Sequence, residues 1–151
     1  MRNKILTVLL ILLLIYICGH SCMPTEVSRE ESGTVLELLR PLLSLIVGAD
    51  NVTLHLVRKL AHFTEFFCLG VVLALRFPFR RVPQLLAGGA ALLTGFIDET
   101  IQIFSGRGPA ISDVWLDFSG SALAILLLAL IRALLRRSRA AGAPTARSDR
   151  H

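Results

Sequence analysis

Charged residues are too scarce in this chain of 151 residues to cover the surface of a soluble domain. They make up 18% of the sequence, whereas hydrophobic residues make up 54%, and a typical globular domain carries about 25% charged residues. Cysteine is also rare: Cys18, Cys22 and Cys68 form neither a CxxC metal motif nor a disulfide framework. The composition therefore favours a membrane protein and gives no sign of a cysteine-based metal centre.

Basic residues outnumber acidic residues by 16 to 11, but they are not interleaved with aromatic residues on one patch, as nucleic-acid recognition would require. They fall in separate clusters that flank apolar segments. We therefore expect no nucleic-acid partner and interpret the basic clusters as signals of membrane topology.

Four apolar segments meet or approach the roughly 20 residues that a transmembrane helix needs. They cover residues 5–19, 56–75, 84–104 and 114–131. The sequence therefore predicts an all-α fold, a small polytopic membrane bundle of about four transmembrane helices. The first segment is short and follows Arg2 and Lys4, so it is either a retained span, which we favour, or a cleaved signal peptide.

The distribution of Lys and Arg predicts the orientation, because short cytoplasmic loops are enriched in these residues. With the N-terminus inside, ten of the eleven acidic residues fall outside or in the outer half of a span. Eleven of the sixteen basic residues then fall on the inner side, namely Arg2, Lys4, Arg76, Arg80, Arg81, Arg132, Arg136, Arg137, Arg139, Arg147 and Arg150. We therefore expect a multi-pass protein of the cytoplasmic membrane with both termini in the cytoplasm.

Two further segments lie outside the predicted spans. Residues 34–47, TVLELLRPLLSLIV, are rich in leucine but contain Pro41, which removes a helix hydrogen bond. We expect a short extracytoplasmic helix here, either on the outer leaflet or as a cap over the bundle. Residues 1–135 are expected to form one transmembrane domain, followed by a basic cytoplasmic tail at 136–151 that is predicted to be disordered.

Polar residues gather at one end of the second, third and fourth predicted spans. Neighbouring spans run in opposite directions, so groups from three helices should meet at the outer end of the bundle. They should face its interior, because an ionised group in hydrocarbon costs at least about 2.5–3.5 kcal/mol. The candidate functional cluster comprises Arg58, Lys59, His62, Glu65, Asp98, Glu99, Gln102, Arg107, Asp113 and Asp117.

A purely structural ion-pair cluster is one interpretation of these residues. We disfavour it because burying an ion pair is often neutral or worse for stability than burying apolar side chains. Small residues, which let helices approach closely, already supply a packing device; they recur every four positions as Ala87, Ala91 and Gly95, and as Gly120 with Ala124.

A metal ion is a further alternative, because His62 and Glu65 have the i, i+3 spacing that metal ligands use in helical bundles. The carboxylates of the third and fourth spans would complete such a site. The pair is short, however, and Arg58 and Lys59 would repel a cation. We therefore expect neither a metal nor another cofactor.

The motifs RKLAHFTEFFCLG and DETIQIFSGRGPAISDVWLDFSGSALA resemble those of the VanZ-like family of small membrane proteins, over about residues 53–130. The chain departs from the family pattern at Phe66, Ser105, Asp117 and Ala124, where tyrosine, proline, asparagine and glycine are usual. The matching positions are Arg58, Lys59, His62, Phe63, Glu65, Asp98, Glu99, Gln102, Phe104, Gly106, Arg107, Asp113 and Gly120. The resemblance implies a protein of the cytoplasmic membrane that is associated with resistance to teicoplanin-type lipoglycopeptides.

Two functional hypotheses follow. In the first, the outer pocket binds a lipid-linked cell-envelope precursor or the acyl tail of the drug, and Arg58, Lys59 and Arg107 contact phosphate groups. In the second, the protein is an enzyme that acts on such a lipid, with His62 or Glu65 as general base. We favour the first, because no serine or cysteine nucleophile stands beside His62 at helical spacing.

Overall fold

The structure is a computed structural model that describes residues 1–78, 80–105 and 110–141. These residues form five α-helices and a short 3-10 helix, without a strand in the described ranges. The elements are α1 (Arg2–Ser21), α2 (Thr25–Val47), η1 (Ala49–Asn51), α3 (Leu54–Arg76), α4 (Arg81–Phe104) and α5 (Ile111–Ala141). The predicted all-α fold is confirmed, and each predicted span lies within one of these helices.

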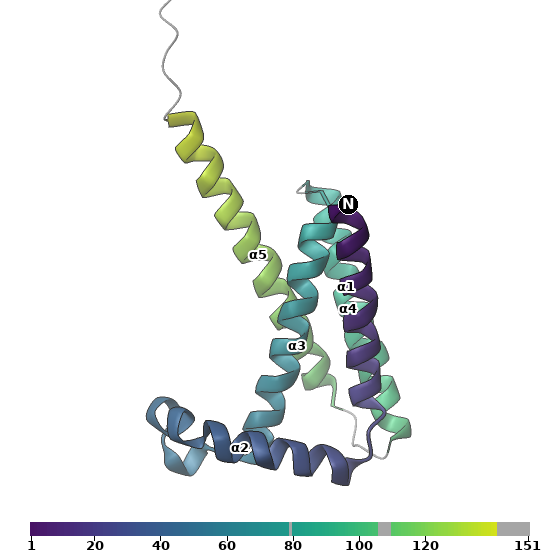
Figure 1. Ribbon diagram of the computed structural model, residues 1–151, viewed down its shortest axis with the longest axis vertical. Helices are drawn as coiled ribbons and strands as arrows, with labels where there is room; N and C mark the ends of the chain where they lie inside the picture. The colour runs from purple at the N-terminus through teal and green to yellow at the C-terminus, as the bar shows by residue number, and fades with distance from the viewer. Residues whose placement is uncertain (79, 106–109, 142–151) are drawn as a thin grey trace, which may run out of the picture.

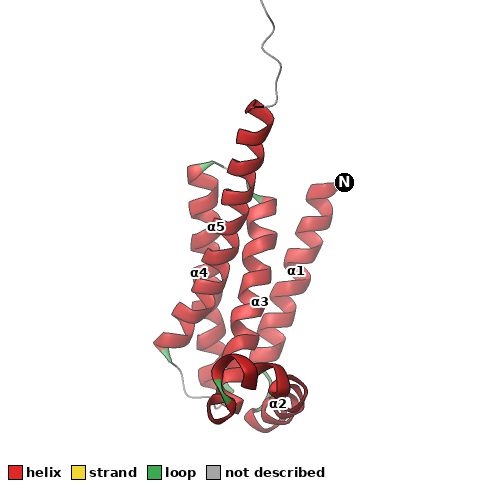
Figure 2. Cartoon of the chain, turned by 90° about the vertical axis from the view of Figure 1, so that its left-hand side faces the viewer, coloured by secondary structure: helices red, strands yellow, loops and turns green. Residues whose placement is uncertain are grey.

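Four helices stand side by side and the fifth lies across one end of them. Figure 1 shows α2 crossing beneath α1 and α3, and Figure 2 shows α1, α3, α4 and α5 as a bundle above it. The chain runs toward α2 in α1 and α4 and away from it in α3 and α5. We call the end of the bundle beside α2 the α2 end; the N-terminus and the end of α5 lie at the opposite end.

Helix α2 is longer than the short helix that the sequence predicted within residues 34–47, because it begins at Thr25, and it continues through Pro41. Proline leaves the carbonyl four residues earlier without its helical partner. That residue, Glu37, is exposed, so its carbonyl can be solvated. The exposed face of this helix is also apolar, with Leu38, Leu45 and Ile46 each more than two thirds accessible.

The end of α5 also differs from the expectation. Residues 136–141 were predicted to belong to a disordered tail, but they continue the helix. Residues 142–151 lie outside the described residues.

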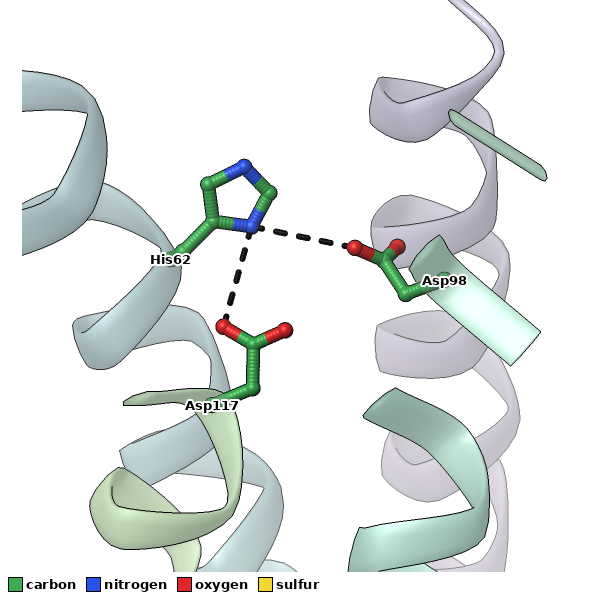
Figure 3. A group of neighbouring side chains, drawn as sticks. All are labelled: His62, Asp98 and Asp117. Carbon is green, nitrogen blue, oxygen red and sulfur yellow. Dashed lines mark ion pairs between the residues drawn. The ribbon is translucent and has the colours of Figure 1, made fainter. Parts of the chain in front are cut away.

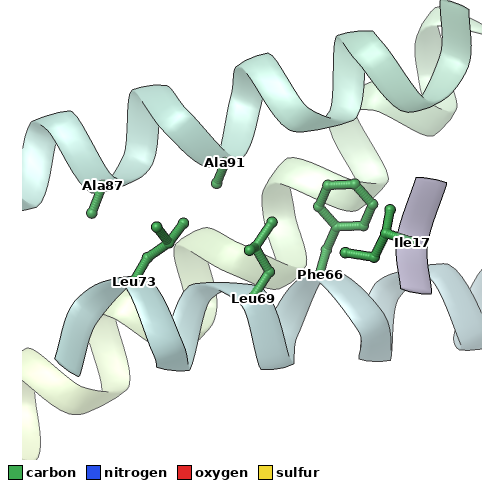
Figure 4. Packing of buried hydrophobic residues seen from close by; sticks show 6 residues of the cluster. All are labelled: Ile17, Phe66, Leu69, Leu73, Ala87 and Ala91. Atoms are coloured by element: carbon green, nitrogen blue, oxygen red, sulfur yellow. The ribbon is translucent and has the colours of Figure 1, made fainter. Parts of the chain in front are cut away.

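The apolar core lies between α1, α3 and α4. Ile17 of α1 packs beside Phe66, Leu69 and Leu73 of α3, and Ala87 and Ala91 of α4 cover them (Figure 4). The two alanines are fully buried. Short side chains on α4 therefore bring this helix close to the larger side chains of α3.

Glycines set the close crossing of α3 and α5. A Cβ atom added to Gly120 of α5 would lie 2.5 Å from the carbonyl oxygen of Phe63, and one added to Gly70 of α3 would lie 2.5 Å from that of Ser121. The hydroxyl of Ser121 donates a hydrogen bond of 2.7 Å to the Phe66 carbonyl across the same crossing. The predicted packing role of Gly120 is confirmed.

Two of the described helices are long and apolar enough to cross a membrane by length and composition, namely α1 and residues Ile111–Arg139 of α5. Both have mostly accessible apolar side chains. Helices α3 and α4 contain 23 and 24 residues, so they are long enough, but their polar residues lower their hydropathy. Of the four predicted spans, this criterion therefore supports two, those in α1 and α5, and does not support those in α3 and α4.

Candidate functional site

His62 lies where three helices meet near the α2 end. Its Nδ1 atom is 3.8 Å from Oδ2 of Asp98 on α4 and 3.9 Å from Oδ1 of Asp117 on α5, which is ion-pair distance when the imidazole is protonated. Figure 3 shows this nitrogen turned toward both carboxylates. The two aspartates are 0% and 1% exposed. The structure thus brings together one predicted residue from each of three helices.

Asp98 is held by two hydrogen bonds from neighbouring side chains. Gln102, one turn later on α4, donates from Nε2 to Oδ2 over 2.8 Å. Ser21, the last residue of α1, donates from its hydroxyl to Oδ1. Hydrogen bonds to the ionised form favour a carboxylate, so both contacts compensate for its burial.

Asp117 is less well satisfied. Its Oδ1 atom is buried, and no hydrogen-bond donor reaches it within the described parts of the chain. Its partner at ion-pair distance is His62. A buried carboxylate oxygen without a donor is costly, and either a proton or a cation relieves that cost.

Helix α1 contributes two residues that the sequence argument did not include. Besides Ser21, His20 places its Nδ1 atom 3.4 Å from Oε1 of Glu65, and its ring lies 5.9 Å from that of His62 between centroids. The signal was present in the sequence: the first span was predicted to run from the inside to the outside, so its last residues were to be expected at the same end as the cluster.

Glu99 and the pair formed by Lys59 and Asp113 lie at the margin of the cluster. Glu99 is 7% exposed, and its Oε2 atom accepts a hydrogen bond of 3.0 Å from the backbone N–H of Ala110, just before α5. Lys59 Nζ is 3.6 Å from Oδ1 of Asp113, with both side chains about one third accessible. Such an exposed pair adds little stability.

The predicted residue Arg107 lies outside the described residues. Its predicted place over the cluster therefore stays a prediction. Arg58 lies within the described part and contributes to a cavity wall.

A polar cavity of about 140 Å³ opens between α1, α2 and α3. Its polar wall includes Arg58, His62 and Glu65 of α3, together with His20 of α1 and Glu31 of α2. Oε2 of Glu31 is 3.8 Å from Nε2 of His20. Helix α2 therefore closes this end of the bundle and adds a polar group to the cavity.

An apolar groove of about 370 Å³ adjoins the polar cavity. Leu13, Leu39 and Leu60 are among its wall residues, one from each of the three helices that bound the cavity. The two hollows share five wall residues, namely Tyr16, Val35, Val57, Ala61 and Glu65. The two hollows are thus neighbours along one side of α3.

One geometric group within the described residues has the composition of a metal site. Ligand atoms of His62, Asp98 and Asp117 lie within 4.8 Å of one another. Neither aspartate belongs to the wall of the polar cavity, so this group lies on a different side of His62.

In a comparison with family models, the model described as VanZ/LLP1 matches residues 6–132. This range runs from Leu6 in α1 to Arg132 in α5, and it includes each described residue of the candidate cluster. No curated protein and no solved structure matches the chain significantly.

Proposed function

The chain belongs to the VanZ/LLP1 family, and from this premise we propose that it is a multi-pass membrane protein that binds a lipid-linked, phosphate-bearing cell-envelope component. The observation that carries the proposal is that the polar cavity and the apolar groove lie side by side and have five wall residues in common. A ligand that fills both has a polar head and an apolar chain. A lipid has this construction.

The proposed membrane arrangement has α1, α3, α4 and α5 as spans. A helix of 23 residues is about 34 Å long, which suffices for a hydrocarbon core of about 30 Å. Several of the polar residues that lower the hydropathy of α3 and α4 lie near the α2 end, and His62 and Asp98 among them are turned toward neighbouring helices. The Lys and Arg distribution predicts cytoplasmic termini, and the α2 end then faces outward.

Helix α2 would then lie in the interface of the outer leaflet. Its exposed residues include Leu38, Leu42, Leu45 and Ile46, and an amphipathic helix can bury such a face among headgroups and upper acyl chains. A lipid in that leaflet would have its headgroup at the level of the polar cavity.

The polar cavity suits a phosphate group. Its volume of about 140 Å³ is below the roughly 300–1,000 Å³ typical of pockets for drug-sized ligands, so it takes a headgroup phosphate and not a whole lipid. Arg58 supplies a guanidinium for charge-assisted hydrogen bonds to phosphate oxygens. The chain of the lipid would lie in the groove of about 370 Å³.

The proposed task fits the resistance to teicoplanin-type drugs that is associated with VanZ-like proteins. These lipoglycopeptides carry an acyl tail and act where lipid-linked wall precursors are exposed. A protein that holds such a precursor at the outer surface would change its availability to the drug. The alternative is that the groove binds the acyl tail of the drug itself. Measuring the retention of lipid and of drug separates the two possibilities.

The experiment is native mass spectrometry of the full chain released from nanodiscs that contain a polyprenyl phosphate. We expect one bound polyprenyl phosphate per chain and much weaker retention of the matching polyprenol, which lacks the phosphate. Arg58→Gln should weaken retention by about tenfold or more, since a hydrogen bond to a charged group contributes about 1.5–3 kcal/mol. Arg40→Gln, at an exposed position of α2, is the matched control and should bind normally.

Other outcomes would overturn the proposal in different ways. A bound lipid of altered mass would indicate an enzyme. Retention of a teicoplanin-type drug but not of polyprenyl phosphate would favour the acyl-tail alternative. Equal retention of polyprenol and polyprenyl phosphate would show that the cavity does not recognise the phosphate. Retention of neither lipid would show that the protein does not bind them. Either result would favour a structural role for the buried polar residues.

A further inference from the structure

We propose that His62, Asp98 and Asp117 form a binding site for one divalent transition-metal ion, with Zn²⁺ as the best fit. This site goes beyond the proposed lipid binding and does not depend on it. The polar cavity wall contains His62 but neither aspartate. The two sites therefore occupy different sides of the same imidazole.

The donor atoms have a spacing that an ion can bridge. Nδ1 of His62 is 3.8 Å from the nearer oxygen of Asp98 and 3.9 Å from that of Asp117. Ligands bound at about 2.0–2.2 Å lie roughly 3.0–3.4 Å apart around a tetrahedral or octahedral ion. All three ligand atoms lie within 4.8 Å of one another, so side-chain rotations of roughly half an ångström to an ångström and a half would complete the coordination. Figure 3 shows Nδ1 of His62 turned toward both carboxylates.

The charge of this group calls for a cation. Asp98 and Asp117 are fully buried carboxylates, and Oδ1 of Asp117 has no hydrogen-bond donor among the described residues. His62 is the partner at ion-pair distance for both aspartates. When both aspartates are ionised, one imidazolium cannot balance them, whereas a divalent ion bound to a neutral imidazole does so.

The surroundings of Asp98 are those of a positioned ligand. Ser21 donates a hydrogen bond to one of its oxygens, and Gln102 donates to the other over 2.8 Å. Groups that hydrogen-bond to a ligating carboxylate orient it and support metal affinity. Residues of four helices, α1, α3, α4 and α5, therefore meet at the proposed metal site.

Repulsion of a cation by Arg58 and Lys59 was the argument against a metal, and the structure weakens it. Lys59 is 3.6 Å from Asp113, a carboxylate outside the proposed ligand set. Arg58 lines the polar cavity, and neither aspartate belongs to the wall of that cavity. The ligands also differ from the expected pair, because Glu65 contacts His20 instead.

The donor set selects among metals. Imidazole nitrogen suits Zn²⁺ and its neighbours better than Mg²⁺ or Ca²⁺, which prefer oxygen ligands alone. Zn²⁺ accepts one histidine with two carboxylates, and three protein ligands leave a fourth position for water. We therefore name Zn²⁺ as the first probe.

The test uses the full-length chain in detergent, stripped with a chelator and then equilibrated with Zn²⁺. We expect one zinc ion per chain by elemental analysis. His62→Gln and Asp117→Asn should each weaken zinc binding at least tenfold. The matched controls are His55→Gln and Asp50→Asn, which change exposed residues of the same types and should bind zinc as the unaltered chain does.

X-ray absorption of the zinc-loaded unaltered chain keeps the proposal testable even where a variant does not fold. We expect a first shell of nitrogen and oxygen at about 2.0–2.1 Å with the scattering pattern of one imidazole. The proposal is overturned by a chain that takes up no zinc, by sulfur in the first shell, or by a folded His62→Gln or Asp117→Asn variant that binds zinc normally. None of these readouts involves lipid, so they are independent of the test of the proposed function.

Discussion

The hydroxyl of Ser21, the last residue of α1, donates a hydrogen bond to the buried carboxylate of Asp98 on α4. Both side chains are 0% exposed. The contact joins residues 77 positions apart and makes the end of the first helix part of the candidate site. The first segment, for which a cleaved signal peptide was the alternative interpretation, thus supplies a hydrogen bond within the polar cluster.

We predict that Ser21→Ala lowers the free energy of unfolding by about 1–3 kcal/mol, because it leaves a buried carboxylate oxygen without its donor. Equilibrium unfolding of the purified chain in mixed micelles measures this change. Ser119→Ala is the control, since the exposed Ser119 hydroxyl donates to the Leu116 carbonyl of its own helix and its loss should change stability by less than about 0.5 kcal/mol. Equal effects of the two substitutions would contradict the assigned role of Ser21.

We also predict that α1 is retained in the mature protein. Ile17 is part of the buried core and Ser21 contacts Asp98, so removal of this helix would expose apolar residues of α3 and free a buried carboxylate. The intact mass of protein purified from membranes should include residues 17–21. A mature N-terminus at residues 20–24, as a signal peptidase would produce, would show that the bundle forms without α1.

The crossing of α3 and α5 gives a prediction with an internal control. A Cβ atom on Gly120 would lie 2.5 Å from the Phe63 carbonyl oxygen, whereas one on Gly89 would meet nothing within 4 Å. Gly120→Ala should lower the free energy of unfolding by about 1–3 kcal/mol, because the backbones must move apart. Gly89→Ala should leave it unchanged or raise it by up to about 1 kcal/mol, since alanine favours a helix.

The same unfolding titration compares these two variants. A Gly120→Ala chain as stable as the Gly89→Ala chain would mean that α3 and α5 do not approach as closely as described. The comparison therefore tests the helix crossing that positions His62 relative to Asp117.

Membrane orientation is tested with reporter fusions. We predict that a reporter after Arg139 and one in the turn between α3 and α4, near Pro78, both report the cytoplasm. A reporter inserted at Gly48, between α2 and η1, should report the extracytoplasmic side. A cytoplasmic signal at Gly48, or an extracytoplasmic one near Pro78, would reverse the side on which the polar cavity opens.

Much of the helical frame could be predicted from the sequence, because apolar length and proline positions largely determine it. The second predicted span began at residue 56, and α3 begins at Leu54, capped by the Thr53 side chain, which accepts a hydrogen bond from the Leu56 N–H over 3.2 Å. The start of α2 at Thr25 was not predicted, because residues 25–33 are mostly polar and give no apolar pattern of helix length.

The candidate site was predictable in its location but not in its contacts. Opposite chain directions of neighbouring spans placed His62, Asp98 and Asp117 at one end, and the structure brings them together. The pairing of Glu65 with His20 was not predicted, because helix periodicity assigns residues to a face without saying which neighbour that face meets. The rotation of each helix within the bundle decides this.

The central claim is that Arg58 holds the phosphate of a lipid in the polar cavity. Solid-state NMR tests it directly, by measuring dipolar coupling between arginine side-chain nitrogen and lipid phosphorus in nanodiscs that contain the labelled chain and a polyprenyl phosphate. We predict a coupling that corresponds to direct contact, present in the unaltered chain and in Arg40→Gln but lost in Arg58→Gln. A chain with stoichiometrically bound lipid and no such coupling, or a coupling that persists in Arg58→Gln, would contradict the claim.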